Sequence, residues 1–297
     1  MKIIVLGAGA IGSLYGSKLS SLNKVTLIAR KSHADEINKN GLRIIGLENK
    51  TFNIKAVTKI KNIEKNTLIL LTSKVYDNEK SIIGIKNLIK NDTIILCLQN
   101  GLCSEDIVKK IVGKKCLVLR GVTNFGAVFL KPGVVEYKNY SYTSIEKSRA
   151  SGKIAENFKQ CGLNGFVSSN IKFDMWKKLV FNCVLNPVTA ILKIENRVIT
   201  DERLDSLKKL IADECVKVAE KDGINFKIDF VRTINIEFKN SRNVSSMRQD
   251  LMKGKKTEID YLNGAVASLG KKYGVNCPVN ESLADIIKFL EKKGRSS

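Results

Sequence analysis

Three polar side chains recur at four-residue intervals in a segment that is otherwise mostly apolar. Lys178, Asn182 and Asn186 are spaced i, i+4 and i+8, so they lie on one face of a predicted helix. An amine and two amides on a helix built for burial cost free energy unless they find partners. The spacing favours a functional face that binds a polar molecule; the alternative is a face that points to water.

Pro187 comes directly after this set. A proline within a helix lacks the backbone N–H and clashes with the carbonyl four residues earlier, here that of Cys183. We therefore expect a kink beside the asparagines, which frees backbone groups for a ligand. The alternative is an ordinary helix end at this point.

A glycine-rich loop after the first apolar run is the second feature that indicates a binding site. Residues 2–6 predict a strand, and residues 7–12 then read Gly-Ala-Gly-Ala-Ile-Gly. In such a loop Gly7 permits the tight turn, Gly9 lets the backbone approach phosphates, and Gly12 lets the next helix pack near the strand. The order strand, loop, helix favours a dinucleotide whose pyrophosphate is held by backbone N–H groups.

The elements that must position these groups begin with an alternation of β-branched runs and helical stretches, as in βαβ units on a parallel sheet. Strands are predicted at 2–6, 25–29, 67–71, 93–98 and 116–120. Helices are predicted at 11–22, 32–39, 78–90 and 104–112. Strands at 42–46 and 51–56 are expected to form a hairpin, and 134–145 irregular β structure.

Helical periodicity dominates beyond about residue 170. Helices are predicted at 173–194, 202–222, 228–239, 257–273 and 280–293. The change predicts an α/β Rossmann-type domain with a parallel sheet over residues 1–170, which binds the cofactor. An all-α domain over residues 171–297 follows and carries the substrate and catalytic groups. The active site is expected in the cleft between the two.

Composition excludes several classes of protein. The chain has 297 residues, of which 43% are hydrophobic and 27% charged, as in a soluble globular protein. Its most apolar stretch, 179–192, is broken by asparagines and a proline, so no membrane span is expected. The formal net charge of +22 raises the question of nucleic-acid binding. The lysines are scattered, however, and no arginine-rich tract stands out, so no nucleic-acid partner is expected.

Cysteine and histidine usage narrows the chemistry further. The seven cysteines form no C-x-x-C pair and have no nearby histidine cluster, so neither a disulfide framework nor a metal site is expected. The single histidine, His33, falls on a predicted surface helix, which argues against histidine-based catalysis. The opening residues also look like a signal peptide, but the glycines up to Gly16 weaken an apolar helix. A cytoplasmic location is therefore expected.

Thr257 and Glu258 precede the predicted helical stripe of the last third. Taken alone, they need be nothing more than first-turn residues, where the helix dipole favours an acid.

In combination these motifs resemble the ketopantoate reductase (2-dehydropantoate 2-reductase) family. The resemblance rests on residues 7–12, 73–74, 99–101, 176–187, 245–250 and 257–260, which follow the family's order across nearly the whole chain. It implies an oxidoreductase that uses NADPH to reduce ketopantoate to (R)-pantoate in pantothenate and coenzyme A biosynthesis. It also implies a C-terminal domain like that of 6-phosphogluconate dehydrogenase.

The resemblance further implies a role for each matching residue. Lys178 matches the general acid, Ser246 a contact of the substrate carboxylate, and Glu258 a contact of the substrate hydroxyl. Other substrate contacts or residues that orient the lysine are matched by Asn100, Asn182, Asn186 and Asn196. The cofactor is contacted in the family by residues that match Gly7, Ala8, Gly9, Ala10, Ile11, Gly12, Arg30, Lys74 and Asn100.

The chemistry needs groups of these types. Hydride addition to a carbonyl builds negative charge on oxygen, which a nearby ammonium both stabilises and protonates. An ordinary lysine, with a pKa of about 10.4, holds its proton at neutral pH. An NAD-preferring domain places an acid at the end of its second strand, whereas this chain has Arg30 and Lys31 there. Two cations favour the 2′-phosphate of NADPH over NADH.

Two alternatives stay open. In the first, the enzyme reduces another small 2-keto acid. In the second, which belongs to a different class of protein, the chain is a basic nucleotide-sensing or nucleic-acid-binding protein. The sequence leaves both a monomer and a homodimer open.

Overall fold

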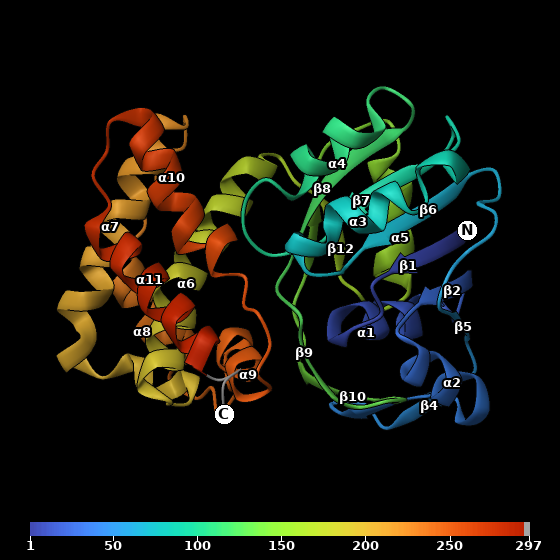
Figure 1. Ribbon diagram of the computed structural model, residues 1–297, viewed down its shortest axis with the longest axis horizontal. Helices are drawn as coiled ribbons and strands as arrows, with labels where there is room; N and C mark the ends of the chain where they lie inside the picture. Colours follow the sequence, from blue (N-terminus) through green and yellow to red (C-terminus); the bar gives the residue numbers. More distant parts are fainter. Residues whose placement is uncertain (294–297) are drawn as a thin grey trace. The chain divides into compact units, whose positions relative to one another are not determined.

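A computed structural model describes residues 1–293 of the protein. By its internal contacts the chain divides into two compact units (Figure 1). The first unit comprises Met1–Gln99 and Cys103–Ile171. The second comprises Asn100–Leu102 and the chain from Lys172 onward. The three residues Asn100–Leu102 therefore leave the α/β unit in which the sequence places them and pack with the helical one.

An eight-stranded sheet forms the centre of the first unit, in the order β12-β11-β8-β7-β6-β1-β2-β5. Its strands are β1 (Lys2–Leu6), β2 (Lys24–Ile28), β5 (Lys55–Val57), β6 (Thr67–Leu71), β7 (Ile94–Cys97), β8 (Leu117–Thr123), β11 (Thr143–Ile145) and β12 (Gly165–Val167). All neighbours run parallel except β8 and β11. The chain leaves β1 toward β2 on one side and later returns to β6 on the other, so the direction of winding reverses at β1.

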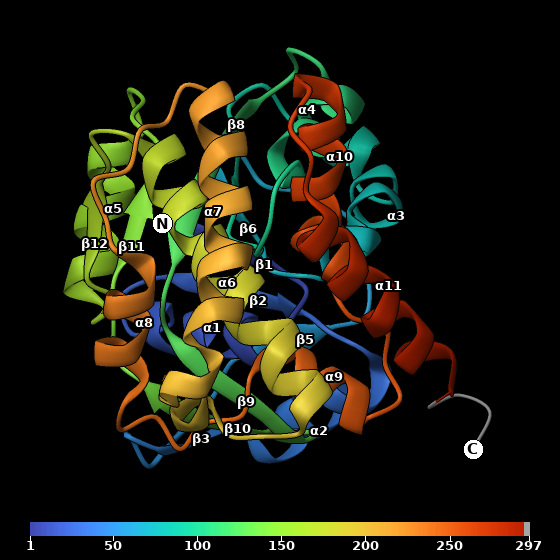
Figure 2. The same ribbon diagram turned by 90° about the vertical axis from the view of Figure 1, so that its left-hand side faces the viewer.

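Helices cover both faces of this sheet, because its central strands are buried at successive positions, as in Ile3–Leu6 of β1 and throughout β6. Ile3 and Val5 of β1 join one core and Ile4 and Leu6 the other. The first core contains residues of α1 (Ala10–Leu19), α2 (Lys31–Asn40) and α5 (Ser151–Gln160). The second contains residues of α3 (Asn78–Ile83) and α4 (Ser104–Val112), which lie side by side in Figures 1 and 2. Two short 3-10 helices, η1 (Val75–Asp77) and η2 (Lys86–Leu88), complete this side.

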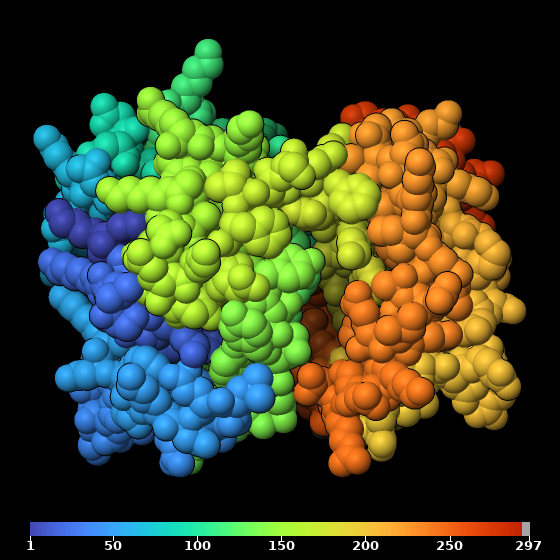
Figure 3. Space-filling model, turned by 180° about the vertical axis from the view of Figure 1, so that it is seen from behind, coloured from blue at the N-terminus to red at the C-terminus, as the bar shows by residue number. Residues whose placement is uncertain are grey.

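A second, four-stranded sheet belongs to the same unit, in the order β4-β3-β10-β9. Its strands are β3 (Leu42–Gly46), β4 (Lys50–Phe52), β9 (Gly126–Lys131) and β10 (Val134–Asn139). Segments distant in sequence also meet at the surface. Asn23 donates to Asn157 Oδ1 at 3.0 Å, and Figure 3 shows the blue N-terminal region beside the yellow-green region around α5.

The second unit is helical. It contains α6 (Ile171–Leu192), η3 (Asn196–Thr200), η4 (Glu202–Leu204), α7 (Asp205–Lys221), α8 (Phe230–Phe238), α9 (Ser246–Met252), η5 (Ile259–Tyr261), α10 (Asn263–Tyr273) and α11 (Pro278–Lys293). Its core gathers around α6, where Trp176, Val180 and Val184 are fully buried.

The predicted architecture of a parallel α/β unit followed by a helical one is confirmed, and the local errors are informative. The predicted strand at 51–56 is two strands: β4 pairs with β3 in the small sheet, whereas β5 joins the large one beside β2. The region 134–145 likewise divides into β10 and β11, which belong to different sheets. The sequence missed α5, α9, β9 and β12.

No helix within residues 1–293 is both long and apolar enough to cross a membrane. In the same residues no cluster of three or more His, Cys, Asp or Glu side chains is arranged to hold a metal ion.

Candidate active site

The glycine loop lies at the carboxyl end of β1, where the winding of the sheet reverses and where open α/β sheets bind their ligands. Gly7 has φ +104°, and a Cβ there would lie 2.4 Å from the backbone nitrogen of Ser73. A Cβ on Gly12 would lie 2.5 Å from both Gly7 O and Thr72 Oγ1. Thr72 in turn donates its hydroxyl to Gly7 O at 3.0 Å. The protein's own backbone therefore excludes side chains at these two glycines.

Gly9 differs from the other two glycines. It is exposed, and a Cβ there would approach only Gly7 O, at 4.0 Å. Gly9 is the N-cap of α1, which has neither a side-chain cap nor an acid in its first turn. The first N–H groups of a helix have no intrahelical partner. The loop thus has open space above unsatisfied backbone donors, which suits a phosphate group.

Two of the predicted cofactor residues stand at the same edge of the sheet, because parallel strands end together. Arg30 is exposed and lies between β2 and α2, where it is the N-cap of that helix. Lys74 follows β6, is half-buried and already has an interaction partner within the protein. Exposed Lys31 comes after Arg30 and pairs with Asp35 at 2.6 Å. This edge carries cations and no acid at the end of β2.

His33 is not on the surface, as the sequence predicted, but is buried with only 3% exposure. Gly133 N–H donates to His33 Nδ1 at 2.9 Å, so the other ring nitrogen carries the hydrogen and faces Ser13 Oγ at 3.0 Å. The ring also packs edge-on against Phe129. Burial lowers the pKa of His33. His33 thus connects α2 to α1 and to the turn between β9 and β10. The prediction of a surface position was wrong because the small sheet covers this helix face, and the helical pattern of α2 does not indicate that sheet.

Asn100 follows β7 in a tightly constrained turn. The side-chain amide of Gln99 donates to Asn78 Oδ1 at 2.5 Å, and the backbone carbonyl of Gln99 accepts from the Arg120 guanidinium at 2.8 Å. Gly101 has φ +78°, and a Cβ there would lie 2.2 Å from Tyr261 O. The N–H of Leu102 donates to this same carbonyl at 3.1 Å. Asn100 therefore follows the buried Gln99 along the chain and belongs, with Gly101 and Leu102, to the second unit.

The stripe on α6 is not a solvent face. Asn186 is buried at 3% exposure, and Lys178 and Asn182 are half-buried. Lys178 has an interaction partner within the protein. The buried Nδ2 of Asn182, in contrast, has no hydrogen-bond partner among residues 1–293. An unpaired buried donor costs about 1–3 kcal/mol, a cost that a bound acceptor would offset.

Pro187 does not end the helix. The alternative of an ordinary helix end is wrong, because α6 continues to Leu192 with the proline inside it. The tertiary packing of α6, which is buried along most of its length after Trp176, outweighs the cost of the missing bond.

Two further segments are bound to α6 and its continuation. Thr189 on α6 donates to Ser245 Oγ at 2.8 Å, and Ser245 is the N-cap of α9. Ser246, the next residue, is exposed. Asn196 starts η3, and its N–H donates to Asn243 O at 2.9 Å. Asn196 Oδ1 is a second buried polar atom without a partner within residues 1–293.

Glu258 is buried at 6% exposure and stands before η5. The predicted helix over 257–273 was wrong at its start, since α10 begins only at Asn263. Thr257 anchors this segment: its N–H donates to Glu291 Oε1 at 2.7 Å and its hydroxyl accepts from the N–H of Ile259. Glu258 is therefore a buried carboxylate in an irregular segment, not an exposed first-turn acid.

The sequence did not indicate which residues hold the predicted ones in place: Thr189 was not singled out, and Gln99 and Ser245 were named only as members of the motifs 99–101 and 245–250, without an anchoring role. Thr189 lies three residues after Asn186 and so extends the same helix face. That spacing was a usable signal. Nothing local identified Ser245 as the residue that α6 binds.

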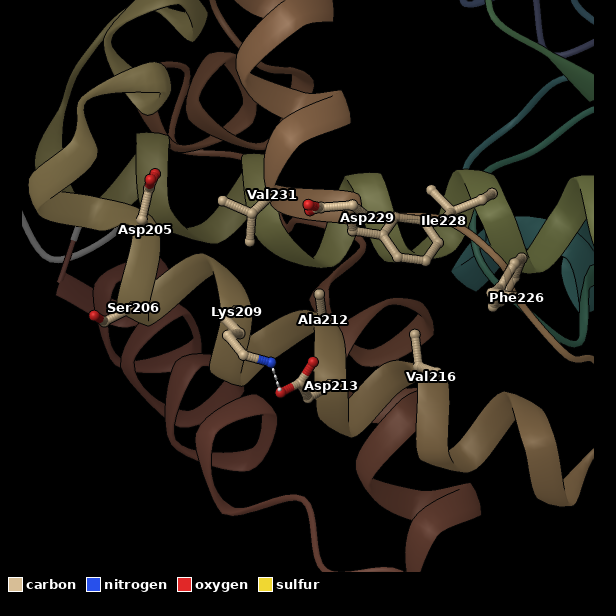
Figure 4. A pocket seen from close by; sticks show the side chains of 11 residues that line it. Asp205, Ser206, Lys209, Ala212, Asp213, Val216, Phe226, Ile228, Asp229 and Val231 are labelled. Carbon is tan, nitrogen blue, oxygen red and sulfur yellow. Dashed lines mark hydrogen bonds and ion pairs between the residues drawn. The ribbon is translucent and has the colours of Figure 1, made fainter.

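A cavity of about 470 Å³ lies elsewhere in the second unit. It opens between α7 and the segment leading into α8, as Figure 4 shows. Apolar side chains such as Val216 and Phe226 line it together with the ion pair of Lys209 and Asp213. None of the predicted site residues lines this cavity.

Comparisons with known proteins identify relatives over the full chain. A family model described as "Ketopantoate reductase PanE/ApbA" matches residues 3–150, and one described as "Ketopantoate reductase PanE/ApbA C terminal" matches residues 170–291. The chain is 37% identical to a 2-dehydropantoate 2-reductase of Pyrococcus horikoshii, with 100% of both chains covered.

Solved structures with the same fold include two kinds of enzyme. A PanE/ApbA family ketopantoate reductase from Ralstonia eutropha has a TM-score of 0.91 at 27% identity, with 99% of this chain and 100% of that chain covered. D-mandelate dehydrogenase in a ternary structure with NADH and anilino(oxo)acetate also has a TM-score of 0.91, at 30% identity and the same coverage.

Proposed function

Since the chain belongs to the ketopantoate reductase PanE/ApbA family, we propose that it reduces 2-dehydropantoate (ketopantoate) to (R)-pantoate with NADPH, as an oxidoreductase of pantothenate and coenzyme A biosynthesis. The first unit binds the cofactor, and the second provides the groups that bind and protonate the keto acid. NADPH supplies the hydride that adds to C2 of the substrate.

One observation carries the proposal. Asn182 Nδ2 and Asn196 Oδ1 are buried and have no partner within residues 1–293. One is a donor and the other an acceptor, so together they match a ligand that offers both, such as a hydroxylated keto acid. Asn182 lies one helical turn after Lys178, which places an amine on the same face.

Lys178 acts as the general acid. Its ammonium stabilises the negative charge that develops on the carbonyl oxygen and donates the proton there. Asn182 and Asn186 follow it on the same face of α6 and orient the amine and the substrate. Because Asn186 is buried, this face stays partly shielded from water, which strengthens each electrostatic contact.

The remaining polar groups bind the other ends of the substrate. Exposed Ser246 contacts its carboxylate, and buried Glu258 accepts a hydrogen bond from its hydroxyl. Asn196 offers a carbonyl oxygen to the same ligand. Asn100 contacts both the substrate and the ribose of the nicotinamide.

The cofactor preference rests on the edge of the first sheet. The pyrophosphate binds in the open space at Gly9, against the uncapped start of α1. The loop that contacts it consists of Gly7, Ala8, Gly9, Ala10, Ile11 and Gly12. Arg30 and Lys74 face the adenosine 2′-phosphate. A ribose hydroxyl does not need these cations, so we expect NADPH to be preferred over NADH.

A second candidate keeps the reaction and changes the substrate. The fold shared with D-mandelate dehydrogenase, solved with NADH, favours another 2-keto acid, including one with an aromatic group. Glu258 distinguishes the two candidates, because ketopantoate carries a hydroxyl that a buried carboxylate accepts from, whereas 2-ketoisovalerate and phenylglyoxylate do not.

The test is cofactor oxidation with ketopantoate, 2-ketoisovalerate and phenylglyoxylate, each with NADPH and with NADH. We expect the highest kcat/KM for ketopantoate with NADPH. Lys178→Ala is expected to lower kcat by about 10²- to 10⁴-fold. Equal rates on ketopantoate and 2-ketoisovalerate would contradict the role of Glu258, and preference for phenylglyoxylate would favour the second candidate.

We further propose that the protein acts in the cytoplasm on small molecules and does not bind nucleic acid. A salt titration of DNA binding tests this, because steep salt dependence with tight binding at physiological salt would support a nucleic-acid role for the +22 charge.

A further inference from the structure

The proline inside α6 leaves one backbone carbonyl without its usual donor. In an α-helix the carbonyl of Cys183 accepts from the N–H of residue 187, which proline lacks. Cys183 is fully buried, so water does not replace the lost bond. An unpaired carbonyl at this depth costs about as much as a lost hydrogen bond.

A side chain from another helix replaces the missing donor. Asn263, the first residue of α10, donates its Nδ2 to Cys183 O at 3.0 Å. Asn263 is itself fully buried. This bond supplies the Cys183 carbonyl with the donor that residue 187 of α6 lacks.

The orientation of the Asn263 amide is fixed by a buried relay. Asn263 Nδ2 also donates to Asn280 Oδ1 at 2.9 Å. Asn280 directs its own NH₂ to Glu214 Oε2 at 2.7 Å and to Ile211 O at 3.2 Å. Since the backbone carbonyls of Cys183 and Ile211 only accept, both amides have a single permitted orientation.

The place of this bond in the second unit connects it to the reaction. Cys183 stands between Asn182 and Asn186, so the proline weakens α6 inside the polar stripe. Asn263 comes five residues after Glu258 and is joined to it through η5. The Asn263–Cys183 bond thus links the segment of the buried carboxylate to the middle of the helix that carries Lys178.

We propose that Asn263 is a positioning residue of the reaction: by completing α6 at Pro187, it fixes Lys178 and Asn182 relative to Asn186 and to the segment of Glu258. This inference rests on the proposed function, since it assigns the residue to the same site. Asn263 touches neither substrate nor cofactor. It acts through the geometry of α6, where displacement of a catalytic group by about 1 Å lowers the rate by up to about 10²-fold.

The first test compares variants of Asn263. Asn263→Ala removes the donor, and Asn263→Asp keeps the size but replaces the NH₂ by oxygen. We expect both to lower kcat for the keto acid by about tenfold to 10²-fold and to leave the Kd for NADPH, measured without keto acid, within about twofold. Ile224→Val, a buried substitution outside α6, is the control for general destabilisation and should change kcat by less than about twofold.

The second test restores the missing backbone donor. Pro187→Ala gives residue 187 an N–H that donates to Cys183 O, so Asn263→Ala should lower Tm and kcat less in this background than in the wild-type chain. The comparison separates the proposed role from simple loss of packing, because the volume removed is the same in both backgrounds.

Equal losses of Tm and kcat in the two backgrounds would overturn the proposal, as would a kcat of Asn263→Ala within about twofold of the wild type. If the wild-type protein reduces none of the keto acids, it is the proposed function that fails. The Tm values of the four chains then still decide whether Asn263 compensates for Pro187.

Discussion

The glycine loop of the first unit and the polar set of the second are built in opposite ways. The loop is six consecutive residues whose useful groups are backbone N–H donors, and its close contacts are with backbone atoms of Ser73 and Gly7 and with the hydroxyl of Thr72. The polar set, Lys178, Asn182, Asn186, Asn196, Ser246 and Glu258, uses side chains from segments up to 80 residues apart. Asn263 Nδ2 bridges the same separation to the backbone carbonyl of Cys183. A backbone site is sensitive to added atoms, whereas a side-chain site is sensitive to lost or displaced ones.

The largest effect expected from this contrast lies in the loop itself. Gly12→Ala places a Cβ within 2.5 Å of Gly7 O and should lower Tm by about 3–10 °C, because the backbone must shift. Gly9→Ala meets no protein atom closer than 4.0 Å and should leave Tm nearly unchanged. It should weaken NADPH binding by at least about tenfold, since the added carbon occupies the space of the phosphate.

Thermal unfolding and fluorescence titration with NADPH measure the two effects separately. A Gly9→Ala variant that binds NADPH as well as the wild type would place the pyrophosphate elsewhere.

The next effect is on cofactor preference and concerns Arg30, a side chain of the first unit. Arg30→Ala should raise the KM for NADPH by about tenfold or more and leave that for NADH almost unchanged, because only the 2′-phosphate needs the guanidinium. Lys24→Ala is the matched control: it removes an exposed cation from the other end of the same strand, where Lys24 pairs with Glu64. Equal effects of the two variants would indicate general electrostatic attraction instead.

A smaller effect distinguishes an unpaired amide from a satisfied one. Asn182→Leu removes a buried donor without a partner and should raise Tm slightly or leave it unchanged, while KM for the keto acid rises about tenfold. Asn38→Leu in the first unit removes an amide that pairs with both Ala56 O at 2.8 Å and Ala56 N at 3.0 Å. This control should lower Tm and leave KM unchanged. A lower Tm for Asn182→Leu would mean that its amide serves folding.

The smallest effect is a pH dependence of the first unit. The folded pKa of His33 is lowered by burial, so the unfolded chain takes up the proton at a higher pH than the folded one. Stability therefore falls as the pH drops below about 6.5, the ordinary pKa of histidine, and this contribution stops changing below the folded pKa. His33→Gln should flatten the Tm profile between about pH 7 and 5. Because the chain has one histidine, its NMR signal reports this pKa directly.

Much of the fold was predictable because its signals are local. The apolar runs 2–6 and 67–71 match β1 and β6 residue for residue, and the residues 104–112 match α4. The errors arose where consecutive strands belong to different sheets. The run at 51–56 has one pattern but supplies both β4 and β5, and no property of its residues states that the chain changes sheets between them.

The site divides along the same line. The spacing of Lys178, Asn182 and Asn186 puts them on one helix face, and this needs only the helical repeat. The burial of His33 and of Glu258 was not predictable, because each is covered by elements distant in the chain: the turn at Gly133 for the histidine, and the segment near Glu291 for the residue next to Glu258.

Several features follow from the residues alone: the α/β unit before the helical one, the loop of Gly7 to Gly12, the cations in place of an acid after β2 and the stripe on α6. Each depends mainly on near neighbours in the chain. Tertiary packing is what carries α6 through Pro187 and lets Asn263 supply the donor that the proline lacks. It also leaves three amide atoms of the second unit, on Asn182, Asn196 and Asn263, buried without partners within residues 1–293. A hydrogen bond between residues 80 positions apart leaves no periodic trace in the chain. It exists only once packing has brought its two ends together.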